Sequence, residues 1–109
     1  MTAPKPPKAF DDFVTRYPEL GEAWTLVSRA GEKGPLDERT RRLVKIGIAV
    51  GALREGAIRS NVRKALAAGS SREEIEQVIA LATSTLGFPS TVAAFTWVGD
   101  LFESAKTTK

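Results

Sequence analysis

The chain has 109 residues, of which 42% are hydrophobic and 27% are charged, and these proportions are typical of one globular domain. Its 16 Lys and Arg residues against 13 Asp and Glu residues give a net charge of +3, too small to indicate a nucleic-acid partner. The sequence contains no Cys and no His. Their absence excludes disulfides, thiol chemistry, histidine acid–base catalysis and the usual zinc sites, so we expect no metal and no cofactor.

The ends of the chain differ in composition from its middle. Residues 1–9 are rich in Pro and Lys and contain no apolar signal segment, which predicts a flexible arm, a cytoplasmic protein and no contact with a membrane. Residues 10–105 are expected to form a single helical domain. The polar residues 106–109 are expected to fray.

Two helices are predicted before the centre of the chain. Apolar residues at helical spacing indicate a short helix over 10–17, and Pro18 starts a second helix that Gly31 and Gly34 end. Trp24 lies on the apolar face of the second helix. We expect Trp24 to anchor the core, with the wall of a pocket as the alternative.

The stretch 36–69 organises the rest of the chain. Asp37 is a suitable N-cap for a helix whose segment 43–53 is apolar on nearly all sides, which predicts that this helix is buried on most sides. An amphipathic helix over 55–68 follows it. A functional site is expected at the junction between the two helices.

Basic residues cluster at the start of the first central helix. The residues are Arg39, Arg41, Arg42 and Lys45. A solvated basic face is the interpretation that we favour, and an anion-binding edge is the alternative.

Two more helices complete the domain. Ser71 and Glu74 have the spacing of a capping box and start a helix that extends to Leu86. The break at 87–89 is followed by a last helix from Pro89 or Ser90. No segment alternates as a strand does, so the fold class is all-α with five or six helices. The predicted core consists of Leu43, Ile46, Val50, Val62, Leu66, Ile75 and Ile79.

Three segments in order carry a resemblance to a known family. They are RRLVKIGIAVGA (41–52), EGAIRSNVRKALAAGSSREEIEQVI (55–79) and TLGFPSTVAAFTW (85–97). Together they resemble the carboxymuconolactone decarboxylase family, which includes the AhpD-like (alkylhydroperoxidase-like) proteins. The resemblance implies an AhpD-like helical domain with a buried central helix pair and a homo-oligomer, either a trimer or a hexamer built from trimers.

Redox members of this family carry a Cys-x-x-Cys-x-x-x-His motif and an upstream Glu. Counted back from Gly69, the two cysteines fall on Arg54 and Ala57, the histidine on Asn61 and the glutamate on Arg42. A peroxidatic centre needs a thiolate, which none of these side chains supplies. The thiol peroxidase activity that the resemblance would suggest is therefore contradicted by the sequence.

Two functions follow from these observations. The first is a degenerate member of the family, an oligomeric helical scaffold that binds a small molecule or a partner. The alternative is a cofactor-free decarboxylase or lyase acting on a small carboxylate or lactone. In that enzyme Arg54 or Arg59 holds the substrate carboxylate, and Glu22 or Glu55 moves a proton. The simpler interpretation of both glutamates is that they are exposed helix residues. Nucleic-acid binding through the basic cluster is a weaker third interpretation.

If a pocket is present, polar side chains beside apolar walls are expected to form it. The candidates for binding a small carboxylate are the polar residues Arg42, Arg54, Arg59, Ser60 and Asn61, with Trp24, Phe88 and Trp97 as apolar walls.

Self-association is expected on physical grounds as well. Gly47 and Gly51 share one helix face, although each Gly costs about 1 kcal/mol relative to Ala in a helix interior. The last helix is apolar on more than one face. A monomer would expose part of this apolar surface, and closed rotational symmetry is a common way to bury it.

Overall fold

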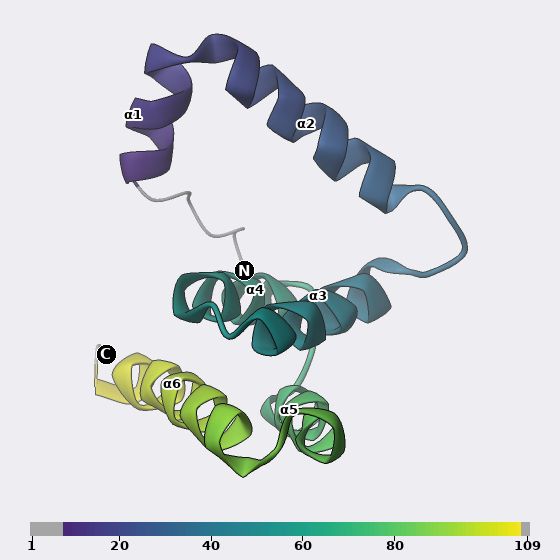
Figure 1. The fold of residues 1–109 in the computed structure, drawn as a ribbon, viewed down its shortest axis with the longest axis vertical. Coiled ribbons are helices and arrows are strands. Elements are labelled where there is room, and N and C mark those ends of the chain that lie inside the picture. The colour runs from purple at the N-terminus through teal and green to yellow at the C-terminus, as the bar shows by residue number, and fades with distance from the viewer. Residues whose placement is uncertain (1–7, 108–109) are drawn as a thin grey trace.

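The computed structural model describes residues 8–107, and over that part the chain forms six α-helices and no strand (Figure 1). The all-α prediction is confirmed. None of these helices is long and apolar enough to cross a membrane. The segment 1–9, which was predicted to be flexible, lies mostly outside the described residues. The helices are α1 Lys8–Arg16, α2 Pro18–Glu32, α3 Glu38–Ala52, α4 Glu55–Ala67, α5 Arg72–Leu86 and α6 Phe88–Thr107.

The six helices divide into two parts. Helices α3 to α6 pack together and form what we call the body, whereas α1 and α2 pack on each other and extend away from it (Figure 1). We call α1 and α2 the arm. No residue of the arm is buried. The arm is joined to the body through residues 33–37.

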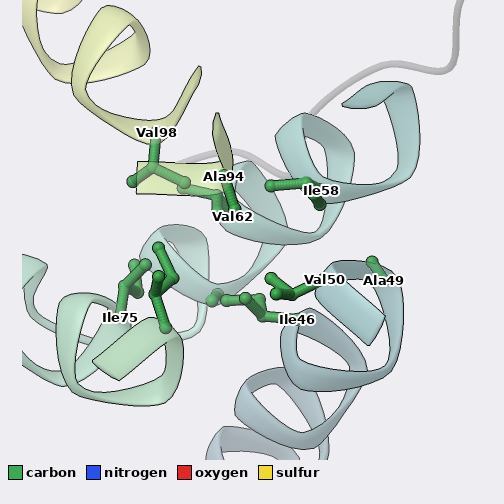
Figure 2. Packing of buried hydrophobic residues seen from close by; sticks show 10 residues of the cluster. Ile46, Ala49, Val50, Ile58, Val62, Ile75, Ala94 and Val98 are labelled. Atoms are coloured by element: carbon green, nitrogen blue, oxygen red, sulfur yellow. The ribbon is translucent and has the colours of Figure 1, made fainter. Parts of the chain in front are cut away.

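The hydrophobic core lies entirely within the body (Figure 2). Ile46 and Val50 of α3 meet Ile58 and Val62 of α4, and all four side chains are fully buried. Burying one such side chain contributes roughly 1.5–3 kcal/mol, so stability resides in the body. Of the predicted core residues, Ile46, Val50, Val62, Ile75 and Ile79 are buried, and Leu43 and Leu66 pack at the edge of the cluster.

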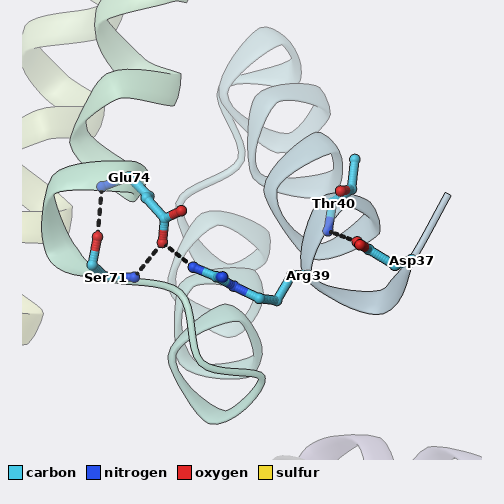
Figure 3. Close-up of polar contacts among 5 residues, drawn as sticks. All are labelled: Asp37, Arg39, Thr40, Ser71 and Glu74. Carbon is cyan, nitrogen blue, oxygen red and sulfur yellow. Dashed lines mark hydrogen bonds and ion pairs between the residues drawn. The ribbon is translucent and has the colours of Figure 1, made fainter.

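Side-chain caps fix the starts of α3 and α5 (Figure 3). Asp37 Oδ1 accepts a hydrogen bond of 2.8 Å from the backbone N–H of Thr40. The predicted capping box is present, because Ser71 Oγ accepts from Glu74 N–H and Glu74 Oε1 accepts from Ser71 N–H. The same carboxylate also binds Arg39 of α3. Glu74 thus caps α5 and ties it to the start of α3.

Helix ends differ from the prediction at several places. Helix α2 continues through Gly31 to Glu32, and the backbone becomes extended at Lys33. Helix α6 begins at Phe88, directly after Gly87, whose φ of +83° favours glycine. The same helix extends as far as Thr107, beyond the expected start of fraying.

Two predictions about burial are wrong. Helix α3 is not buried on most sides, since Val44 and Ile48 are 47% and 66% exposed. Trp24 does not anchor the core, since it is 51% exposed. Both errors have the same physical cause: the arm does not pack down on the outer face of α3.

Stability in acid is predicted to depend on Glu74. The hydrogen bond from the Ser71 backbone N–H, aided by Arg39, lowers the pKa of Glu74 below its usual 4.5. The stabilisation is therefore complete above pH 4.5 and is lost as the pH falls through the lower pKa of the folded protein. Glu74→Gln is expected to flatten the dependence of the unfolding free energy on pH below about pH 4.5, as measured by urea denaturation.

Glu73→Gln provides the control, because Glu73 is the exposed neighbour of Glu74 in the same first turn of α5. This variant should keep the pH dependence of the wild type. Equal slopes for Glu74→Gln and the wild type would contradict the assignment.

Candidate functional site

The arm and the body together line a pocket of about 380 Å³, which we call the arm pocket. Trp24 and Val27 of α2 form one apolar wall, and Val44 and Ile48 of α3 form the opposite wall. The complete lining is Trp24, Val27, Ser28, Gly31, Glu32, Leu36, Arg41, Arg42, Val44, Lys45, Ile48 and Lys64.

Positive charge exceeds negative charge in the arm pocket. Four cations line it, Arg41, Arg42, Lys45 and Lys64, and Glu32 is its one acid. Arg41 donates a 2.6 Å hydrogen bond to the carbonyl of Leu36. Among the described residues, no ion pair joins the other three cations to an acid.

Lys64 shows the electrostatic consequence. Burial of its ammonium group lowers its pKa from 10.5, and repulsion from Arg42 and Lys45 lowers it further. Desolvation and like charges both disfavour the protonated form. An anion bound beside Lys64 would oppose the second effect.

The chemistry of the arm pocket is that of binding. Apolar walls beside a few convergent charges are the usual form of a small-molecule site. Arg guanidinium and Lys ammonium groups bind carboxylates through charge-assisted hydrogen bonds. Within the described part of the chain, no group of three or more acidic residues could hold a metal ion.

The structure brings some of the sequence candidates into this pocket. Arg42 and Trp24 line it, and Trp24 contributes to a wall, which is the alternative prediction for this residue. Arg41 and Lys45, which also belong to the basic cluster, line it too. Lys64 was missed, because only the packing of α4 on α3 brings it near these residues.

The candidates on α4 lie elsewhere. Arg54 is the exposed N-cap residue of α4. Arg59 Nε donates to Glu55 at 2.9 Å, and its other end lies 3.8 Å from Asp100. Asn61 Nδ2 donates to the backbone carbonyl of Ala57 at 2.9 Å. These residues do not line the arm pocket.

The remaining candidates are also separate from it. Ser60 is half-buried on α4, and Glu22 is exposed on α2. Phe88 lines a groove between α5 and α6. Trp97 packs against the hydrophobic core. The turn that joins α3 to α4, where a site was expected, holds Leu53 in the left-handed conformation and contributes nothing to the arm pocket.

The protein is an all-helical protein with a cation-lined pocket that contains no thiol. The comparisons with known proteins identify its family. The model of the carboxymuconolactone decarboxylase family matches residues 18–100. The chain therefore belongs to that family. A search of curated proteins finds no match.

A solved structure supports the same assignment. It is the apo form of a carboxymuconolactone decarboxylase family protein from Legionella pneumophila, with a TM-score of 0.79 and 25% identity over 88% of this chain and 87% of that one.

Removing the charge of Lys64 is predicted to stabilise the protein without ligand. Because its pKa is lowered in the folded state, protonated Lys64 is less favourable there than in the unfolded chain. Lys64→Met keeps an apolar stem and removes this penalty, so it should raise Tm at neutral pH. The gain should shrink as the pH rises towards 10.5, where the unfolded chain also loses the proton.

Arg63→Met is the matched control, because Arg63 is an exposed cation next to Lys64 on α4. It should leave Tm almost unchanged. A lower Tm for Lys64→Met at neutral pH would refute the repulsion that we assign to the pocket.

Proposed function

We propose that this protein is a thiol-independent member of the carboxymuconolactone decarboxylase family that binds a small apolar carboxylate in the arm pocket. The observation that carries the proposal is the convergence of Arg42, Lys45 and Lys64, without acidic partners, beside the wall formed by Trp24 and Val27. An excess of one charge is unfavourable where it is partly removed from water, as at Lys64, unless a counter-charge offsets it.

Each part of the pocket has a role in this proposal. Arg42 offers a planar fork that can bind both carboxylate oxygens, whereas Lys45 and Lys64 act as point charges. Trp24 and Ile48 contact the apolar part of the ligand from opposite walls. Glu32, the one acid of the lining, repels a second carboxylate, which favours ligands with a single negative charge.

The proposed function excludes thiol peroxidase activity. Reduction of a peroxide by this family's route needs a thiolate and a proton relay. The chain has no Cys and no His, and the matching positions carry Arg54, Ala57, Asn61 and Arg42.

A cofactor-free lyase is the second candidate, and one observation bears on it. Such an enzyme needs an acid or base within reach of its substrate. Glu22 and Glu55 do not line the arm pocket, whereas Glu32 does. We therefore assign the proton-transfer role of this alternative to Glu32. Release of CO₂ from a bound carboxylate, lost in Glu32→Gln, would favour the lyase over the binding protein.

We further propose that the protein is a homo-oligomer, a trimer or a hexamer built from trimers. Two separate apolar surfaces support this. One is the outer face of α3, and the other is on α6, where Phe88, Val92 and Phe95 are 73%, 56% and 50% exposed. A hexamer with both two-fold and three-fold contacts would bury both surfaces.

Carboxylate binding is predicted to depend on the cations of the arm pocket. Benzoate and octanoate should raise Tm, whereas the uncharged benzamide and octanol should not. Loss of one charge-assisted hydrogen bond is worth about 1.5–3 kcal/mol, so Arg42→Met and Lys64→Met should weaken binding at least about tenfold in calorimetric titration.

Arg63→Met again serves as the control and should bind like the wild type. Equal Tm shifts for acids and amides, or full affinity in both pocket variants, would overturn the proposal. Slow release of CO₂ together with normal binding would support the assigned site and would identify the protein as a lyase rather than a binding protein.

Peroxide turnover is predicted to be absent. Pure protein incubated with a dithiol and an organic hydroperoxide should consume peroxide no faster than the dithiol alone, because no side chain of the chain forms a reactive thiolate. The measurement is peroxide remaining over time. Turnover that rises with protein concentration would contradict this expectation.

A further inference from the structure

One side chain of the arm pocket has the setting of a nucleophile. Lys64 is the residue that α4 contributes to the lining of this pocket. It is half-buried, whereas Lys33 and Lys45 are exposed. Ser28 lines the same pocket, but a serine hydroxyl needs an adjacent base to become a nucleophile, and an uncharged amine needs none. Lys64 is therefore the side chain that can carry covalent chemistry here.

The surroundings of Lys64 favour its uncharged amine. Arg42 and Lys45 are three residues apart and share one face of α3, and the packing of α4 on α3 brings Lys64 into the same pocket. Burial is the larger cause that lowers the pKa of Lys64, and the two cations lower it further. Arg41 and Glu32 complete the charged lining, and no ion pair among the described residues joins Glu32 to Lys64. A lysine that is desolvated beside other cations is an activated nucleophile.

The rest of the lining fits a ligand that carries both a carboxylate and a carbonyl. Arg42 and Lys45 bind a carboxylate, and Trp24 and Ile48 contact an apolar group. The amine of Lys64 attacks an electrophilic carbon, which a simple carboxylate does not offer. An α-keto acid has its ketone carbon next to its carboxylate, so one molecule meets the cations and the amine together.

We infer that Lys64 binds the ketone of an apolar α-keto acid covalently, as an imine, in the arm pocket. The inference rests on the proposed function, because Arg42 and Lys45 hold the carboxylate of the same ligand. The lone pair of Lys64 Nζ attacks the ketone carbon, and the ketone oxygen takes up a proton to give a carbinolamine. This hydroxyl leaves as water while the C=N bond forms. Both hydrogens of the water come from the amine by exchange through solvent, so the step needs no oxidant or reductant.

The carboxylate of the ligand does not remove the main cause that keeps Lys64 uncharged. It opposes the repulsion from Arg42 and Lys45, but burial is the larger cause of the lowered pKa of Lys64. A ligand that covers the amine increases this burial. Once the imine nitrogen is protonated, the same carboxylate stabilises the new cation. The ligand therefore favours the covalent product as well as the first contact.

Reductive trapping tests the inference. The protein is incubated near neutral pH with phenylpyruvate and sodium cyanoborohydride, which reduces an imine to a stable secondary amine, and is then digested for mass spectrometry. The adduct should form on Lys64 at least about tenfold faster than on Lys33 or Lys45, because free amine and bound ligand meet only there. The peptide map also separates Lys64 from the terminal amine of the chain. Equal labelling of the three lysines would overturn the inference.

Two analogues of phenylpyruvate distinguish this inference from the proposed function. Phenylpropionate keeps the carboxylate and lacks the ketone, so it should raise Tm and slow the trapping of phenylpyruvate. Phenylacetone keeps the ketone and lacks the carboxylate, so it should label Lys64 at least about tenfold more slowly than phenylpyruvate. A Tm shift with phenylpropionate but no phenylpyruvate adduct on Lys64 would overturn the imine and keep the binding site. Equal labelling of Lys64 by phenylacetone and phenylpyruvate would overturn the proposed function and the keto acid with it.

A pH profile measures the state of Lys64 without any carboxylate contact. Acetic anhydride reacts with free amines, and its rate at Lys64 should reach half of its maximum below pH 10.5. In Arg42→Met this midpoint should rise, because a cation that disfavours the protonated amine is removed. Arg63→Met is the control and should keep the wild-type midpoint, since Arg63 is exposed and adjacent residues of a helix do not face each other. A midpoint at the ordinary value of lysine, or one that Arg42→Met leaves unchanged, would overturn the inference.

Discussion

The failure of the arm to pack on its own body is the constraint on which the rest of this structure depends. Helices α1 and α2 bury no residue, while the body closes its core among α3, α4, α5 and α6. The outer face of α3 therefore stays open, with Val44 and Ile48 exposed. The same separation creates the arm pocket, because its two walls would otherwise meet.

Charge in the arm pocket opposes stability, and this opposition is informative about function. Lys64 is partly buried beside Arg42 and Lys45, and both burial and repulsion lower its pKa. A fold selected only for stability would place an acid or an apolar residue there. Binding sites often retain such unfavourable groups. A ligand of opposite charge relieves the repulsion between them when it binds, and this relief strengthens binding.

Capping and core patterns were predictable because they depend on neighbours in sequence. The Asp37 cap and the box of Ser71 and Glu74 act within one helical turn, so the spacing of residue types was sufficient to find them. The burial of Ile46, Val50 and Val62 followed from helical periodicity. The family resemblance had the same basis, since its segments match in order along the chain.

The sequence by itself therefore determined an all-α fold of five or six helices, the core of the body and the absence of thiol and histidine chemistry. Only the tertiary structure decided that Trp24 faces a pocket and that Lys64 lies near the cations of α3. It also showed that Asn61 donates a hydrogen bond to the carbonyl of Ala57 and that Arg59 forms an ion pair with Glu55. The physical reason is that periodicity reports that a face is apolar but not what covers it. Long-range packing, which no local pattern encodes, places α4 beside α3 and leaves α1 and α2 apart from the body.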